Sequence, residues 1–85
     1  MNYPPDIWNQ LKNKSPDDFI RALKKDGWIF DTSSGSSQAY FNPQTGNRVT
    51  IHLHPGKIYG RDMLQMLIKD IGWSVEDMKR IKFVK

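Results

Sequence analysis

The stretch RVTIHLH, residues 48–54, constrains the fold more than any other part of the chain. Apolar and polar residues alternate strictly along it, as in a β-strand with one buried and one solvent-facing side. The apolar side consists of Val49, Ile51 and Leu53. The polar side consists of Arg48, Thr50, His52 and His54. Such a strand needs a sheet around it and helices over its apolar side, while the other side of an antiparallel sheet can stay wet.

The segment SPDDFIRALKKDGW, residues 15–28, predicts a helix before the strands. Ser15 is placed to cap its N-terminus, Pro16 suits the first helical position, and Gly27 is a typical stop. Asp18 stands at the third helical position, where a carboxylate favours the helix start. The stripe expected to face the core consists of Phe19, Ile20 and Leu23.

A second long helix is predicted after the strands, in RDMLQMLIKDIGW, where Gly72 marks its end. Its apolar residues recur at helical spacing and are Met63, Leu64, Leu67, Ile68 and Ile71. Short helices are expected at both ends of the chain. One runs from Pro5 to about Asn13, and the other is capped by Ser74 with Asp77 at its third position.

Between the two long helices the sequence has three β-like runs, at 28–31, 38–42 and 48–54. The polar segment TSSGSS, 32–37, reads as a flexible loop, and a turn containing Gly46 separates the second and third runs. The predicted order is α–β–β–β–α, an α+β fold with a three-stranded antiparallel meander and helices on one face. We expect one domain over 1–85, with 1–14 as a lead-in.

The composition narrows the classes of function. The chain has 85 residues and no cysteine, which excludes disulfides, thiolate zinc sites and cysteine catalysis and fits a cytoplasmic protein. No run suggests a signal peptide or a membrane span. The formal net charge is +4, and no Asp or Glu occurs between Asp31 and Asp62. This stretch is compatible with a polyanion partner and equally with the small number of carboxylates that strands and turns ordinarily contain.

His52 and His54 are the two histidines of the chain, and they would lie about 7 Å apart on one face of a strand. Metal-free RNA cleavage needs a base for the 2′-hydroxyl and an acid for the leaving 5′-oxygen, and histidine suits both steps. The alternative is that both are merely solvated. A metal site is disfavoured, because zinc normally takes three or four ligands and no Cys or carboxylate is near in sequence. We therefore expect no metal or cofactor.

Other residues could contact RNA around these histidines. Cations that could meet phosphates are Arg48, Lys57 and Arg61. Ser37 and Gln38 can hydrogen-bond RNA but are poor bases. Tyr40 is a candidate for base stacking, with packing inside the sheet as the equal alternative. Trp28 and Trp73 each follow a helix-ending Gly or Gly-containing turn, which favours core packing.

An ordered series of motifs runs from Asp17 to Met78. It comprises a helix ending in Gly-Trp, a Gly-Ser loop before an aromatic residue, a turn with Pro and Gly, an RVT strand ending in His, a basic Gly-containing loop, and a leucine-rich helix. The series resembles the HicA (YcfA-like) toxins of bacterial toxin–antitoxin systems. The resemblance implies a fold like a double-stranded-RNA-binding domain, an mRNA interferase activity, and a HicB-like antitoxin as partner.

The chain departs from this family in the loop before the second strand. The family usually has Gly-Ser-His there and uses that His in catalysis, whereas this chain has Gly35, Ser36 and Ser37. His54 matches a His often found at the end of the third strand, and His52 is an addition. The chain thus resembles a divergent branch. It is either an endoribonuclease using His54 and His52, or a catalytically degenerate RNA-binding or antitoxin-docking module.

Overall fold

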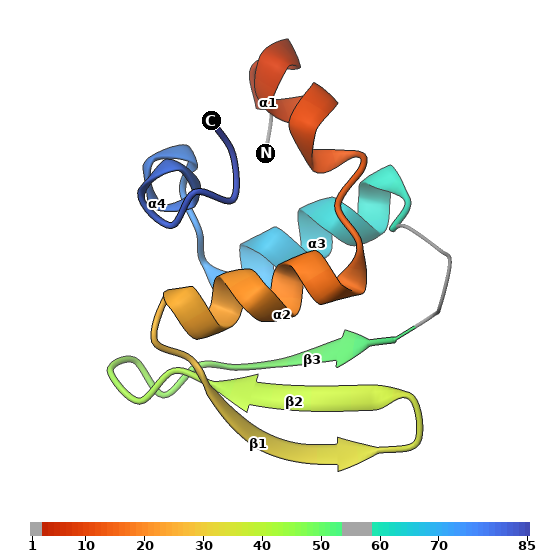
Figure 1. The fold of residues 1–85 in the computed structure, drawn as a ribbon, viewed down its shortest axis with the longest axis vertical. Coiled ribbons are helices and arrows are strands. Elements are labelled where there is room, and N and C mark those ends of the chain that lie inside the picture. Colours follow the sequence, from red (N-terminus) through yellow and green to blue (C-terminus); the bar gives the residue numbers. More distant parts are fainter. Residues whose placement is uncertain (1–2, 54–58) are drawn as a thin grey trace.

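The computed structural model describes residues 3–53 and 59–85. In chain order their elements are α1 (Pro5–Leu11), α2 (Pro16–Lys25), β1 (Ile29–Ser34), β2 (Ser37–Phe41), β3 (Arg48–His52), α3 (Arg61–Ile71) and α4 (Val75–Arg80). The three strands form one antiparallel sheet in the order β1-β2-β3. Figure 1 shows the predicted α–β–β–β–α order between two short extra helices, so the predicted α+β fold class is confirmed.

Capping residues set the starts of two helices, as the sequence predicted. The Ser15 hydroxyl accepts the Asp18 N–H at 3.2 Å, and the Asp18 carboxylate accepts the Ser15 N–H at 2.8 Å. Ser74 and Asp77 make the same reciprocal pair at the start of α4, at 3.1 and 3.0 Å. Each pair satisfies two backbone donors that a helix start would otherwise leave unpaired.

The alternation along β3 orients the sheet. Val49 and Ile51 are buried, whereas Arg48, Thr50 and His52 are exposed. This confirms the predicted two-sided strand over the described residues. The regular strand ends at His52, and Leu53 continues the pairing through a single backbone hydrogen bond to the Ser36 carbonyl.

The segment predicted as a flexible loop, TSSGSS, is instead mostly strand. β1 continues to Ser34 and β2 begins at Ser37, so Gly35 and Ser36 alone form the turn. Gly35 takes a φ of 57°, a conformation that glycine adopts without steric cost at the first position of a tight hairpin turn. The prediction was wrong because strands pair through backbone hydrogen bonds, which serine residues can form as well as other residues do.

The helices cover the sheet unevenly. α2 and α3 lie against β3, and α1 and α4 lie beyond them, farther from the sheet (Figure 1). β1 is farthest from the helices, and all six of its residues are exposed, including Ile29 and Phe30 at 48% each. The buried core therefore lies between β3, β2 and the helices.

One residue of the predicted α3 stripe lies outside the core. Met63 is 48% exposed, although Leu64, Leu67, Ile68 and Ile71 are buried. The buried stripe is narrower than the apolar pattern, so Met63, like the more exposed Met66, lies outside it.

Asp26 joins three distant parts of the chain. Its carboxylate accepts the indole N–H groups of Trp28 at 3.1 Å and Trp73 at 2.8 Å, and it pairs with the Arg80 guanidinium at 2.7 Å. Both tryptophans are buried, which confirms that they belong to the core. One carboxylate thus holds the end of α2, the end of α3 and α4 together.

Asp26→Asn is expected to lower the free energy of unfolding by about 1–3 kcal/mol near neutral pH, because it weakens a charge-assisted bond to Arg80 and places an amide among donors. Urea unfolding measures the change. Asp70→Asn, the same replacement at an exposed site of α3, is the matched control and should stay within about 0.5 kcal/mol of the parent. Equal stability of the two variants would contradict this role.

The stability that Asp26 provides should depend on pH. Burial raises the pKa of this carboxyl, but the hydrogen bonds from Arg80, Trp73 and Trp28 outweigh it, and the pKa lies below its ordinary value. A depressed pKa contributes stability above the unfolded value of about 3.9, and this stability is lost as pH falls through the folded pKa. The parent and Asp26→Asn unfolding free energies should therefore converge between about pH 5 and pH 2. A constant difference would contradict the assignment.

Candidate functional site

Ser37 and His52 face each other across the exposed side of the sheet. They are register partners in the β2–β3 ladder, at the first residue of β2 and the last of β3. The Ser37 Oγ lies 3.0 Å from the His52 Nδ1, within hydrogen-bond distance. The structure thus brings together the residue at the family's usual histidine position and the histidine that this sequence adds.

This contact orients the imidazole while leaving its chemistry open. A serine hydroxyl can donate to an unprotonated Nδ1 or accept from an Nδ1–H, so the bond is compatible with either neutral tautomer. With an Nδ1–H, Nε2 is unprotonated and can act as a base, whereas the doubly protonated imidazolium, whose Nδ1–H also donates to the serine hydroxyl, can act as an acid through its Nε2–H. His52 is exposed, so a ligand on this side of the sheet can reach the ring.

Arg48 lies at the other end of β3 and has a partner that sequence reasoning missed. Its guanidinium is 2.9 Å from the Asp31 carboxylate, with both side chains substantially exposed. Asp31 sits in β1 where the register with β2 shifts, between Phe30 and Thr32. Its place as the last carboxylate before the acid-free stretch was visible in the sequence, but the pairing with Arg48 depends on how β1 and β3 are aligned across β2.

Gln38 and Tyr40 lie on the opposite side of the sheet from His52, since their β3 partners are the buried Ile51 and Val49. The Tyr40 hydroxyl donates to the Gln38 Oε1 at 2.8 Å, and the ring is 2% exposed. Burial also raises the pKa of Tyr40. Of the two roles considered for Tyr40, the structure shows packing inside the sheet.

Of the remaining predicted site residues, the structure describes only Arg61. Arg61, the first residue of α3, lies over the Trp8 ring, 5.0 Å from its centroid. His54 and Lys57 lie outside the described residues, so the predicted pairing of the two histidines stays a prediction. The neighbour that the structure does place at His52 is Tyr59, whose hydroxyl donates to the His52 carbonyl at 3.1 Å.

A shallow groove of about 370 Å³ runs between β3 and α3 beside His52. Its exposed lining includes Arg48, Thr50, His52, Met63, Met66 and Asp70.

In the described parts of the chain, no three side chains of the metal-binding types come close enough to hold an ion. Across the same residues, no helix combines the length and apolar character needed to span a membrane.

The family comparison agrees with this architecture. The model for the HicA toxin of bacterial toxin–antitoxin systems matches residues 16–73, from the first residue of α2 through the sheet to the tryptophan after α3. Ser37 and His52 lie inside the match, whereas α1 and α4 lie outside it. A comparison with curated proteins gives no significant match. Because the family match spans well over half of the sequence, the chain belongs to the HicA toxin family of bacterial toxin–antitoxin systems.

Proposed function

We propose that this HicA-family chain is the toxin of a type II toxin–antitoxin pair and cleaves mRNA as a cytoplasmic, metal-independent endoribonuclease. The observation that carries the proposal is the 3.0 Å contact between Ser37 and His52. In the family that this sequence resembles, the loop usually reads Gly-Ser-His, and its catalytic histidine corresponds to Ser37 of this chain. Here an imidazole reaches the same spot from the neighbouring strand, so the chemistry can survive the loss of the loop histidine.

In the proposed reaction the 2′-hydroxyl of RNA attacks the adjacent phosphorus. The bond from O2′ to phosphorus forms, the bond from phosphorus to O5′ breaks, and the products carry a 2′,3′-cyclic phosphate and a 5′-hydroxyl. His52 Nε2 accepts the 2′-hydroxyl proton or donates a proton to O5′. His54 is the proposed partner for the other proton, and Arg48, Lys57 and Arg61 are proposed to meet phosphate oxygens.

A second candidate function is RNA binding without cleavage, on a fold like that of double-stranded-RNA-binding domains. It is favoured by Ser37, because a serine cannot perform the proton transfers that a histidine performs at this position. Both candidates need RNA on the exposed side of the sheet. They differ only in whether His52 acts on the bound phosphate.

We also propose that a HicB-like antitoxin fills the groove between β3 and α3. Met63 and Met66 are 48% and 61% exposed there, and flexible thioether side chains adapt well to a partner surface. His52 borders the same groove. A protein seated on the two methionines would therefore cover His52 and block RNA from reaching it.

His52→Ala is expected to lower cleavage of purified RNA in the presence of EDTA by about 10²–10⁴-fold, because it removes a general acid or base. His54→Ala is tested alongside, and Lys24→Gln, on the exposed surface of α2, is the control that should cleave like the parent. Parent activity with no loss in either histidine variant would contradict the site. No growth arrest and intact mRNA after induction in bacterial cells would contradict the toxin activity itself.

Asp31→Asn is expected to raise RNA affinity by about two- to fivefold at low salt, because it frees the Arg48 guanidinium from its exposed ion pair. Filter binding at several salt concentrations measures the gain, which should shrink as salt rises. Arg48→Gln should weaken binding and remove the effect of Asp31→Asn. An unchanged affinity in the Asp31 variant would show that RNA does not reach Arg48.

Met66→Glu is expected to reduce co-purification with the antitoxin by at least tenfold, because it buries a charge in an apolar contact. RNA cleavage by the free toxin should persist. Ile29→Glu, at a comparably exposed apolar residue of β1, is the matched control and should retain the partner. Equal retention of antitoxin by both variants would move its docking site away from the groove.

A further inference from the structure

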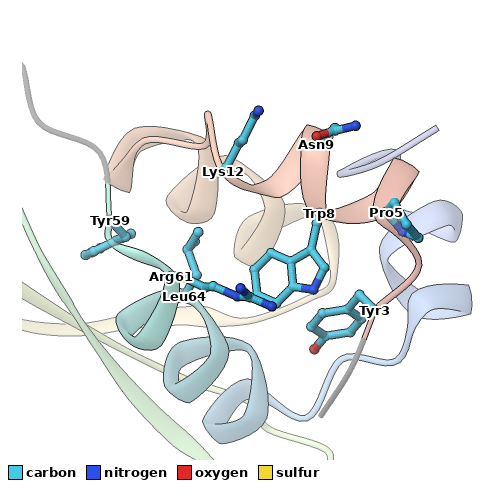
Figure 2. Close-up of a pocket in the computed structure, with 8 residues that line it drawn as sticks. All are labelled: Tyr3, Pro5, Trp8, Asn9, Lys12, Tyr59, Arg61 and Leu64. Atoms are coloured by element: carbon cyan, nitrogen blue, oxygen red, sulfur yellow. The ribbon is translucent and has the colours of Figure 1, made fainter.

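A second, larger pocket lies between α1 and the start of α3, away from the exposed side of the sheet. Its volume is about 580 Å³. Figure 2 shows Trp8 pointing from α1 toward α3, with Tyr3 beside it and the Arg61 guanidinium beneath the indole. Tyr59 forms another part of the wall. Three aromatic rings therefore surround one opening.

The charged residues known to line this pocket are basic. Lys12 and Arg61 are among its lining residues, and within residues 3–53 and 59–85 no Asp or Glu lines it. Asn9 adds an amide that can both donate and accept hydrogen bonds. Aromatic faces combined with cations, without a carboxylate, suit a ligand that joins a flat ring to an anion.

Trp8 differs from the other tryptophans of the chain in its environment. Trp28 and Trp73 are buried and donate to Asp26, whereas Trp8 is only partly buried. Its ring meets Tyr3 edge-on, with centroids 5.3 Å apart and an interplanar angle of 73°. An accessible indole with a cation 5.0 Å from its centroid is the arrangement on which single-stranded nucleic-acid bases stack.

Tyr59 links this pocket to the backbone of His52. Tyr59 lines the pocket, and its hydroxyl donates to the His52 carbonyl at 3.1 Å. Burial raises the pKa of Tyr59, and the bond to the His52 backbone lowers it less, so the hydroxyl stays a neutral donor at physiological pH. A strand of RNA held at His52 can thus extend over Tyr59 toward Trp8.

We propose that this pocket binds one nucleotide of an RNA strand next to the cleaved phosphate, with the base stacked against Trp8 and its phosphate paired with Lys12 and Arg61. The inference rests on the proposed action on RNA and adds a base-binding subsite to it. Tyr3, Trp8 and Lys12 precede residue 16, where the family match begins. The N-terminal segment therefore provides the Trp8 side of the subsite, whereas Tyr59 and Arg61 on the other side lie inside the matched region.

Trp8 fluorescence tests the subsite. In the His52→Ala variant, which cannot cleave, titration with AMP or a short single-stranded oligoribonucleotide should quench the emission, and Trp8→Phe should abolish the quenching because the other indoles are buried. Ribose 5-phosphate, which has no base, should quench far less than AMP. Trp8→Leu should weaken oligonucleotide binding by about 5- to 100-fold, the effect of losing one base–aromatic stack.

Two charge variants complete the experiment. Arg61→Gln should weaken binding mainly at low salt, whereas Lys24→Gln, the same loss of charge on the exposed surface of α2, should not. Equal binding of AMP and ribose 5-phosphate, or oligonucleotide affinity unaffected in both Trp8 variants, would overturn the subsite. Quenching of Trp8 by the antitoxin protein but not by RNA would overturn it in favour of a peptide pocket.

The outcomes separate this inference from the proposed function. If nucleotides quench Trp8 while the parent protein leaves RNA intact, the result supports the subsite and contradicts the nuclease activity. If the parent cleaves RNA through His52 while the Trp8 variants bind and cleave normally, the result supports the nuclease activity and contradicts the subsite.

Discussion

The pairing register of β2 and β3 is the constraint on which the exposed site depends. Ser37 meets His52 only because Gln38 and Tyr40 pair with the buried Ile51 and Val49. Side chains alternate between the two faces of a strand, so a slip of one residue would bury the imidazole and expose the core. The packing energy of the apolar side therefore fixes the position of the polar side. Stability and chemistry are coupled through a single strand.

The helices, the caps and the two sides of β3 could be predicted because each depends on residues close in sequence. Ser15 and Ser74 are typical N-cap residues that mark the starts of their helices, and the alternation of polar and apolar residues from Arg48 to His52 predicts the strand. The failures involve distant partners or backbone pairing. The serine-rich hairpin forms through ladder bonds that carry no side-chain pattern. The ion pair of Asp31 with Arg48 joins residues of β1 and β3 that no local motif connects.

The candidate site shows the same division. The sequence indicated His52 as exposed on a strand and Ser37 as a departure from the family motif, yet only the fold shows that they touch. The pocket around Trp8 was missed because one wall comes from the N-terminal segment and the other from Tyr59 and the start of α3, which are far from it in the chain. The proposed binding of RNA at both features rests on their side-chain chemistry rather than on net charge. One offers an oriented imidazole, and the other offers aromatic faces beside cations.

We propose above all that His52 performs, from β3, the chemistry that the family resemblance assigns to a histidine at the position of Ser37. The most direct test moves the imidazole back across the ladder. Cleavage of purified RNA should be lost in His52→Ala and restored, at least in part, when Ser37→His is added to that variant. Undiminished cleavage in His52→Ala, or no recovery in a folded double variant, would contradict the claim.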